Sequence, residues 1–229
     1  MRKLRTIEMH RLSVEQFKEA AKLPLIVVLD DVRSLHNVGS VFRTCDAFRV
    51  QAVYLCGITA TPPNAEIHKT ALGGEDSVDW RYFETAEAAV EDLHRRGYWV
   101  YSVEQVEGSV KLENLNLTAG SSPAEQDDDG DEVMRDEGLA VRSSPAERDD
   151  DGDEVMRDEG LAVGSSPAER GQGYAVIFGN EVKGVKQRVV DMSDACLEIP
   201  QFGTKHSLNV SVTAGIVIWE FARQLLLRR

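Results

Sequence analysis

The sequence has few cysteines and lacks the short motifs of several common enzyme classes. Its three cysteines are scattered singly with no CxxC spacing, which predicts buried, reduced thiols rather than a disulfide framework. It contains no GxGxxG after the first apolar segment, no GxxxxGK[ST] and no GxSxG, so dinucleotide-binding, P-loop and serine-hydrolase functions have no support. The sequence has no close cluster of His, Cys and carboxylates, so we expect no metal site.

Long apolar runs are missing as well. No run reaches the length that a bilayer span needs, and the basic start at residues 1–17 is not followed by an apolar segment of the kind that signal peptides carry. We therefore expect a cytoplasmic protein with no membrane partner. The 229 residues, of which 42% are hydrophobic, are enough for one domain of ordinary size with an appendage.

The formal net charge of −13 is concentrated in one segment. Residues 121–170 hold 17 Asp or Glu against five Arg, a net charge of −12, which leaves only −1 for the rest of the chain. The acidic pI therefore says little about what the remaining residues bind. The opening residues 1–11 carry four Lys or Arg and could face the phosphates of a nucleic acid.

The acidic segment is a tandem repeat with a period of 22 residues, with full copies at 121–142 and 143–164 and the start of a third at 165. Copies this polar cannot bury a shared core, so we predict a disordered insertion over residues 119–172. A second interpretation is weak cation binding, because acidic residues and a glycine fall near calcium-loop positions: Glu125, Asp127, Asp129, Gly130 and Asp136. A calcium titration without heat or spectral change would exclude it.

Apolar strands alternate with amphipathic helices along the rest of the chain. This alternation predicts an α/β fold with a mostly parallel sheet flanked by helices, and a ligand crevice at the strand ends. Residues 1–23 form a basic arm and short helix, and residues 24–229 form the domain that the insertion interrupts. The expected strands are 25–29, 52–56, 98–103, 174–178 and 195–199, and the expected helices are 13–21, 37–48, 64–72 (stopped by the glycines at 73 and 74), 86–96, 185–192 and 208–227.

Three polar clusters fall at the ends of predicted strands and combine glycines, one cation, one carboxylate and neutral hydrogen-bonding groups. Taken singly, each residue has an ordinary structural explanation, such as a helix cap, a loop glycine or an exposed charge. Their joint arrangement favours a functional site. The clusters are Asn37, Gly39 and Arg43; Gly179, Asn180, Glu181 and Gly184; and Gly203, Ser207 and Asn209.

These clusters belong to longer segments that resemble a known family. NVGSVFR, IFGNEVKG and IPQFGTKHSLNVSVTAGIVIWE, in this order, are similar to the three signature motifs of the SpoU (TrmH-like) RNA 2′-O-ribose methyltransferases, and HKTALGGE resembles a further family segment. The resemblance covers roughly residues 24–118 and 173–226. It implies a C-terminal deep trefoil knot, a homodimer, S-adenosylmethionine as cofactor, and tRNA or rRNA rather than DNA as substrate.

The resemblance also implies roles for individual residues. Arg43 would activate a ribose 2′-hydroxyl, either as a base after losing its proton or as a cation that stabilises the alkoxide; Asn37, Glu181, Ser207 and Asn209 would complete the catalytic site. A competing hypothesis is a catalytically silent RNA-binding dimer that retains the knotted fold. The residues implied in cofactor binding are Phe178, Gly179, Asn180, Gly184, Ile199, Gly203, Leu208 and Asn209.

Overall fold

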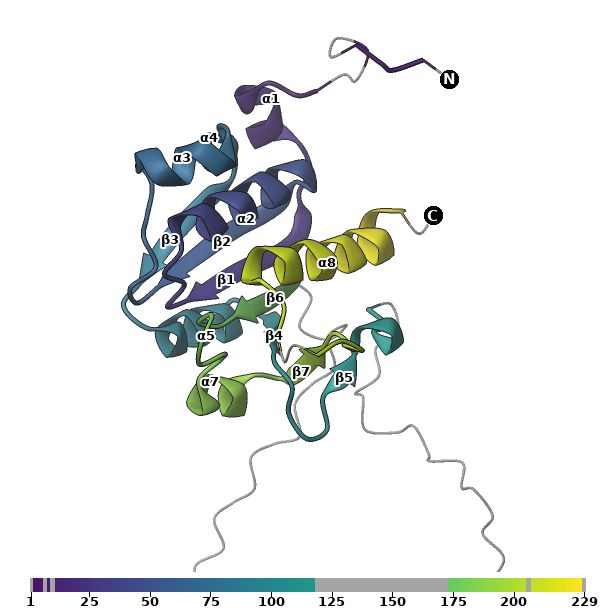
Figure 1. The fold of residues 1–229 in the computed structure, drawn as a ribbon. Helices are drawn as coiled ribbons and strands as arrows, with labels where there is room; N and C mark the ends of the chain where they lie inside the picture. Colours follow the sequence, from purple (N-terminus) through teal and green to yellow (C-terminus); the bar gives the residue numbers. More distant parts are fainter. Residues whose placement is uncertain (1, 6–7, 9–10, 118–172, 205–206, 228–229) are drawn as a thin grey trace, which may run out of the picture. The chain divides into compact units, whose positions relative to one another are not determined.

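The computed structural model describes residues 2–5, 8, 11–117, 173–204 and 207–227. The predicted insertion at 119–172 and its calcium-loop interpretation lie outside the described residues. The described residues fold as an α/β structure around a single sheet (Figure 1). This confirms the fold class expected from the alternation of strands and helices.

The sheet has seven strands in the order β3-β2-β1-β6-β4-β7-β5, and every pairing between the described strands is parallel. The five predicted strands are all present. Two short edge strands were not predicted, because β3 is largely exposed and charged and β5 has only two residues. The strands are β1 (Leu23–Asp30), β2 (Val50–Cys56), β3 (Asp79–Phe83), β4 (Tyr98–Val103), β5 (Val110–Lys111), β6 (Gly173–Phe178) and β7 (Ala195–Glu198).

Both faces of the sheet are buried, as a parallel sheet requires. On β1, the side chains of Leu25 and Val27 enter one core together with α2, α3 and α8, whereas those of Ile26 and Val28 enter a second core with α5 and α7. The helices are α1 (Val14–Glu19), α2 (Leu35–Ala47), α3 (Ala65–Ala71), α4 (Gly74–Ser77), α5 (Ala86–Arg95), α7 (Gln187–Met192) and α8 (Val210–Ala222), with η2 (Leu112–Asn114) and η3 (Arg223–Leu227) as short further turns.

The three cysteines are buried and free, as predicted. Burial raises the pKa of the Cys45 and Cys56 thiols, so neither is poised as a nucleophile. These cysteines therefore serve as small apolar side chains in the cores.

Helix α2 lies very close to α3, and Gly39 permits the approach. A Cβ at this position would lie 2.2 Å from Oγ1 of Thr70 and 2.3 Å from the carbonyl oxygen of Ile67. The Thr70 hydroxyl also donates to the carbonyl of His36 at 3.0 Å. The segment HKTALGGE thus holds the helix that carries the first motif in place against the sheet.

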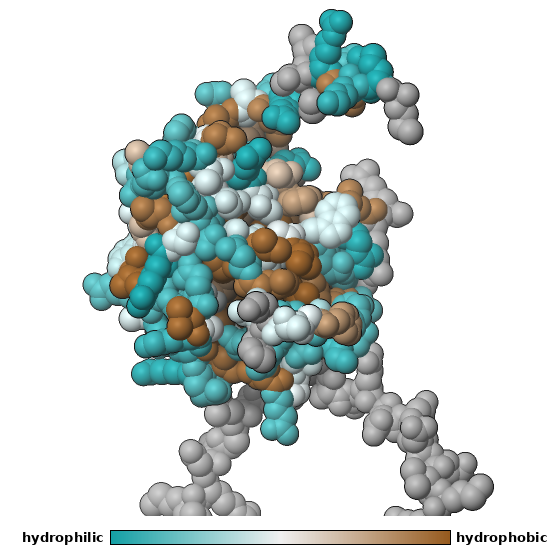
Figure 2. All heavy atoms as spheres, in the orientation of Figure 1, coloured by the Kyte–Doolittle hydropathy of each residue, from teal (hydrophilic) through white to brown (hydrophobic). Residues whose placement is uncertain are grey.

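Helix α8 combines a buried face with an exposed apolar face. Residues 210–227 are long and apolar enough to cross a membrane by length and composition alone, so the expectation that no run reaches this length is wrong. Ala214, Val217, Ile218 and Phe221 nevertheless pack into the core. On the outer side, apolar residues are exposed over α8 (Figure 2): Val212, Ile216 and Trp219 are 52%, 37% and 47% exposed.

Candidate active site

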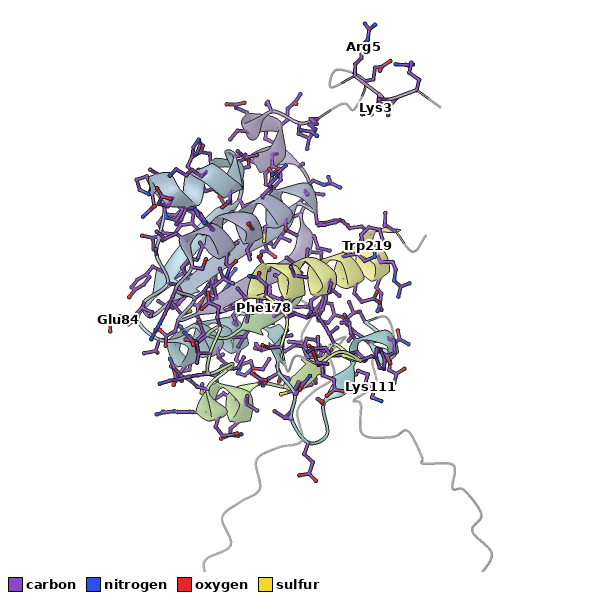
Figure 3. The ribbon with its side chains drawn as sticks, in the orientation of Figure 1. Lys3, Arg5, Glu84, Lys111, Phe178 and Trp219 are labelled. Atoms are coloured by element: carbon purple, nitrogen blue, oxygen red, sulfur yellow. The ribbon has the colours of Figure 1, made fainter. Side chains whose placement is uncertain are left out.

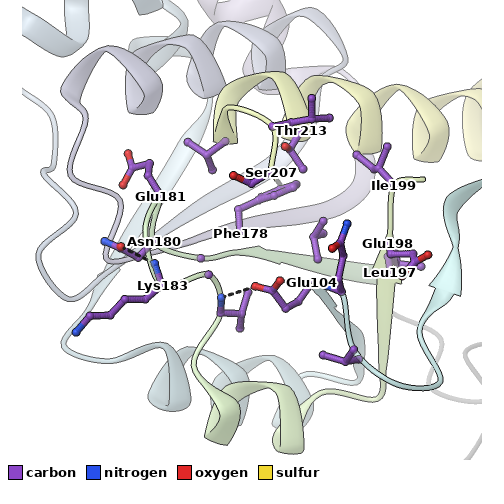
Figure 4. A pocket seen from close by; sticks show the side chains of 18 of the residues that line it. Glu104, Phe178, Asn180, Glu181, Lys183, Leu197, Glu198, Ile199, Ser207 and Thr213 are labelled. Atoms are coloured by element: carbon purple, nitrogen blue, oxygen red, sulfur yellow. Dashed lines mark hydrogen bonds between the residues drawn. The ribbon is translucent and has the colours of Figure 1, made fainter. Parts of the chain in front are cut away.

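A cavity of about 470 Å³ opens at the carboxyl ends of β4, β6 and β7 (Figure 4). Crevices at this end of a parallel sheet are the usual ligand sites of α/β folds, and the volume lies in the range of small-molecule pockets. Phe178 at the end of β6 forms part of its wall and lies beside the first turn of α8 (Figure 3). Of the residues predicted to bind a cofactor, Phe178, Gly179, Asn180, Gly184, Ile199 and Leu208 line the cavity.

Two predicted cofactor residues lie elsewhere. Gly203 sits on the exposed loop between β7 and α8, outside the cavity lining, and no described atom lies within 4 Å of a Cβ added to it. Asn209 is the N-cap of α8 and is also outside the lining. Ser207, predicted as a catalytic residue, does line the cavity.

The loop after β6 is a tight turn closed by backbone hydrogen bonds. The N–H of Asn180 donates to the carbonyl of Gly184 at 3.1 Å, and the N–H of Gly184 donates back at 2.9 Å. A Cβ on Gly179 would lie 2.2 Å from the carbonyl carbon of Gly184 and 2.3 Å from the nitrogen of Val185, so only glycine fits. This turn presents backbone groups to the cavity, which is how glycine-rich loops approach ligands closely.

Side chains from other elements anchor the turn. The Asn180 amide donates to the carbonyl of Asp31, at the end of β1, at 2.8 Å. Lys186 forms ion pairs with the carboxylates of Asp30 at 3.2 Å and Asp31 at 2.8 Å. Burial raises the pKa of Asp30, and the ion pair with Lys186 opposes this effect. The loop is therefore held to the central strands from both of its ends.

Glu104, which was not predicted, is a cavity-lining carboxylate just after β4. Its Oε2 accepts the N–H of Val185 at 2.9 Å, and its Oε1 accepts the N–H of Gln105 at 3.0 Å. A Cβ on Gly184 would lie 2.1 Å from Oε2. No motif in the sequence marked this residue, because its role depends on the pairing of β4 with β6.

A chain of hydrogen bonds joins one residue from each of the three predicted clusters. The Asn37 amide donates to Oε1 of Glu181 at 3.3 Å, and the Asn209 amide donates to Oδ1 of Asn37 at 3.1 Å. The parallel register that places Leu29 opposite Phe178 brings the loops after β1 and β6 side by side. Residues separated by more than a hundred positions thereby meet, as the joint arrangement of the clusters predicted.

Glu181 accepts hydrogen bonds from several donors. Burial alone would raise the pKa of its carboxyl, but hydrogen bonds from its own backbone N–H, from those of Arg33 and Ser34, and from the Asn37 amide outweigh burial and lower it. Glu181 is consequently a hydrogen-bond acceptor at neutral pH and a weak base.

We expect the Asn37→Ala variant to raise the pKa of Glu181 toward the ordinary value. Because the folded-state pKa is lowered, the stabilisation from Glu181 is complete above the unfolded value of about 4.3 and is lost as the pH falls through the folded value. Side-chain carboxyl NMR of Glu181 during an acid titration would measure the change. An unchanged titration curve in the variant would show that the Asn37 amide contributes nothing.

Arg43 lies on α2 and is exposed, and its guanidinium has no hydrogen-bond or ion-pair partner among the described residues. The backbone of Arg43 packs closely against Gly74, because a Cβ on Gly74 would lie 3.2 Å from the Cα and nitrogen of Arg43. This contact holds the backbone in place while the side chain stays unbound. The guanidinium is therefore available to a ligand. Hydrogen bonds join Asn37, Glu181 and Asn209 directly, whereas among the described residues the Arg43 side chain forms no hydrogen bond or ion pair with any of these three.

The cavity lies at the carboxyl ends of parallel strands and is lined by a glycine-rich turn, and hydrogen bonds join Asn37, Glu181 and Asn209 beside it. These features define an α/β protein with a pocket of the kind that binds cofactors. Residues 24–126 and 143–219 match the model of the SpoU rRNA Methylase family. The chain belongs to this family.

Curated relatives extend the comparison. The chain is 24% identical over 205 residues to the 23S rRNA (guanosine-2′-O-)-methyltransferase RlmB of Neisseria meningitidis, covering 90% of this chain and 60% of the relative's length. It is 23% identical over 219 residues to the tRNA (guanosine(18)-2′-O)-methyltransferase of Thermus thermophilus, covering 96% and 84%.

Solved structures share the fold. The A. aeolicus TrmH/SpoU tRNA modifying enzyme superposes with a TM-score of 0.62 at 20% identity, covering 92% of this chain and 81% of that one. The AdoMet-bound rRNA methyltransferase from Sinorhizobium meliloti has a TM-score of 0.61 at 20% identity, covering 90% and 61%. These similarities confirm the mostly parallel α/β architecture.

Proposed function

We propose that this protein is an S-adenosylmethionine-dependent methyltransferase that acts on a ribose 2′-hydroxyl of tRNA or rRNA. The observation that carries the proposal is the chain of hydrogen bonds between Glu181, Asn37 and Asn209, hereafter the relay. It lies beside the cavity that the turn after β6 lines. Membership of the family, and relatives named as guanosine 2′-O-methyltransferases, support it. A catalytically silent RNA-binding dimer is disfavoured, because Arg43 and the relay are all present.

The cavity suits S-adenosylmethionine in size and chemistry. Phe178, Leu197, Ile199 and Leu208 give apolar walls for the base, and the turn after β6 gives backbone donors and acceptors. The cofactor supplies an electrophilic methyl group on a sulfonium. The residues expected to hold it are the lining residues of the turn and of the loop after β7.

The residues of the chain have separate roles in the proposed reaction. The Arg43 guanidinium stays protonated, because its ordinary pKa exceeds 12, and its N–H groups stabilise the negative charge that develops on the ribose oxygen. The hydroxyl proton leaves to solvent as the oxygen takes the methyl group. Asn37, held between Glu181 and Asn209, orients the ribose, and Ser207 faces it from the cavity wall.

Incubation of the protein with methyl-labelled S-adenosylmethionine and total cellular RNA tests the proposal. We expect label in a tRNA or rRNA pool, and nuclease mapping should locate it on a ribose 2′-oxygen. If cofactor binds but no pool is labelled, the silent-dimer hypothesis holds instead. Arg43→Ala serves as the matched control for activity that does not depend on the site.

We also propose that the protein is a homodimer and that the exposed apolar face of α8 contributes to the interface. Val212, Ile216 and Trp219 recur at helical spacing on this face, and the exposure of a row of apolar side chains to water is unfavourable. Occupancy by a second copy accords with the resemblance to the family. We further propose that the protein is cytoplasmic, that its domain limits are 1–23 and 24–229, and that its C-terminal part forms a trefoil knot.

We expect Ile216→Asp to shift the protein from dimer to monomer, with at least a tenfold rise in the dissociation constant, because a carboxylate would be desolvated at the interface. Sedimentation equilibrium measures the shift. Ile58→Asp, at an exposed apolar residue after β2, is the matched control and should leave the mass unchanged. A wild-type protein that is monomeric at micromolar concentration would refute the proposal.

A further inference from the structure

The charged side chains that line the cavity are predominantly acidic. Among the described lining residues they are Glu104, Glu181, Glu198 and Lys183. In Figure 4 the Lys183 side chain extends away from the cavity, whereas Glu104 lies between the turn after β6 and strand β7. The interior of the cavity therefore has carboxylates on its walls without a cation beside them among the described residues.

Glu104 is the carboxylate whose position is fixed most firmly. Its two oxygens accept backbone N–H groups of Val185 and Gln105, its own N–H donates to the carbonyl of Leu197 at 3.0 Å, and a Cβ on Gly184 would collide with it. These hydrogen bonds use one lone pair on each oxygen and leave the negative charge in place. A charge held this way acts on a ligand without a reorganisation penalty.

Resting on the proposed function, we propose that Glu104 is a specificity residue that makes the cavity prefer the cationic cofactor to its neutral product. S-adenosylmethionine carries a sulfonium, and S-adenosylhomocysteine carries a neutral thioether at the same place. Apart from the transferred methyl group the two ligands are the same, so a fixed negative charge distinguishes them electrostatically. A cavity of this volume is about 10 Å across, so a bound sulfonium lies well within the range of the Glu104 charge.

The consequence for turnover is a bias against the product. Methyl transfer removes the positive charge from the ligand while Glu104 keeps its charge, so the attraction is lost at the moment when the product must leave. Substrate and product compete for the same pocket, and the ratio of their affinities sets how strongly the product inhibits. Glu104 thus lowers product inhibition without touching the reacting atoms.

Isothermal titration calorimetry of the full chain with each ligand tests the inference. We expect Glu104→Gln to lower the ratio of S-adenosylmethionine affinity to S-adenosylhomocysteine affinity by about three- to tenfold, chiefly through weaker binding of the sulfonium. Gln keeps an oxygen that can accept the Val185 N–H, so the turn should persist. Glu107→Gln, an equal charge change at an exposed residue outside the cavity lining, should leave the ratio unchanged within twofold.

Two further measurements keep the outcome clear. Glu104→Asp retains the charge and should retain most of the preference. In the wild type, raising the salt concentration should weaken S-adenosylmethionine more than S-adenosylhomocysteine, a result that does not depend on any variant folding. If Glu104→Gln weakens both ligands equally, or if salt affects both equally, the inference is wrong while the proposed function stands. If neither ligand binds the wild type, the proposed function is wrong as well.

Discussion

Gly179→Ala is expected to weaken S-adenosylmethionine binding by about 10- to 100-fold. The added Cβ would lie 2.2 Å from the carbonyl carbon of Gly184 and 2.3 Å from its oxygen. These are backbone atoms of the turn itself, so they can move only if the paired hydrogen bonds between Asn180 and Gly184 open. The cavity then loses the wall that the turn supplies. Calorimetry with the cofactor measures the loss.

Gly203→Ala is the matched control. Gly203 has no described atom within 4 Å of an added Cβ and lies outside the cavity lining. We expect cofactor affinity within about twofold of the wild type, since the substitution meets no steric barrier. Equal losses in the two variants would mean that the loop before α8 closes on the cofactor and that Gly203 binds it, as the sequence predicted.

Arg43→Lys is expected to lower kcat by about 100- to 1000-fold. Lysine keeps the positive charge but loses the planar fork that can donate two parallel hydrogen bonds. Arg43 lies outside the cavity lining, so the cofactor should bind the variant as well as the wild type. Single-turnover methylation of the mapped RNA measures the effect, with calorimetry on the same preparation as the control.

The size of the loss separates the two roles of Arg43. A residue that only stabilises charge should be partly replaced by lysine and not at all by alanine. If residue 43 acts as a base, the methylation rate should rise as the pH approaches its pKa. That rise should move to lower pH in the Lys variant, because the ordinary pKa of lysine, about 10.4, is below that of arginine. Full activity in Arg43→Lys would exclude any specific role for the guanidinium.

The sequence predicted the strands that are buried on both faces, because continuous apolar runs such as that of β1 are unmistakable. It did not predict β3, whose alternating exposed residues include Asp79 and Arg81, or the two-residue β5. An edge strand needs little apolar character, because only one side of it pairs. Periodicity therefore finds the centre of this sheet and misses its edges.

The candidate site divides in the same way. The motifs predicted Asn37, Glu181 and Asn209, which meet in space. They did not predict Glu104, whose contacts depend on the loops after β4 and β6 lying together, and they placed Gly203 in a pocket that it does not line. Asn209, expected both in the catalytic site and at the cofactor, is the N-cap of α8 and donates a hydrogen bond to Asn37. Which residues line the cavity depends on how strands distant in the sequence pair. Local sequence patterns contain no information on that pairing.

The order of the strands has a consequence for how the chain folds during synthesis. Strand β6 lies between β1 and β4, although it is made after both. Until residue 178 has left the ribosome, β1 and β4 each expose an unpaired edge with apolar faces, and neither can pair with the other in the native order. Native contacts of such sequence separation form slowly. The nascent chain is therefore exposed to aggregation for most of its synthesis, and a fragment that ends before β6 should be retained by chaperones.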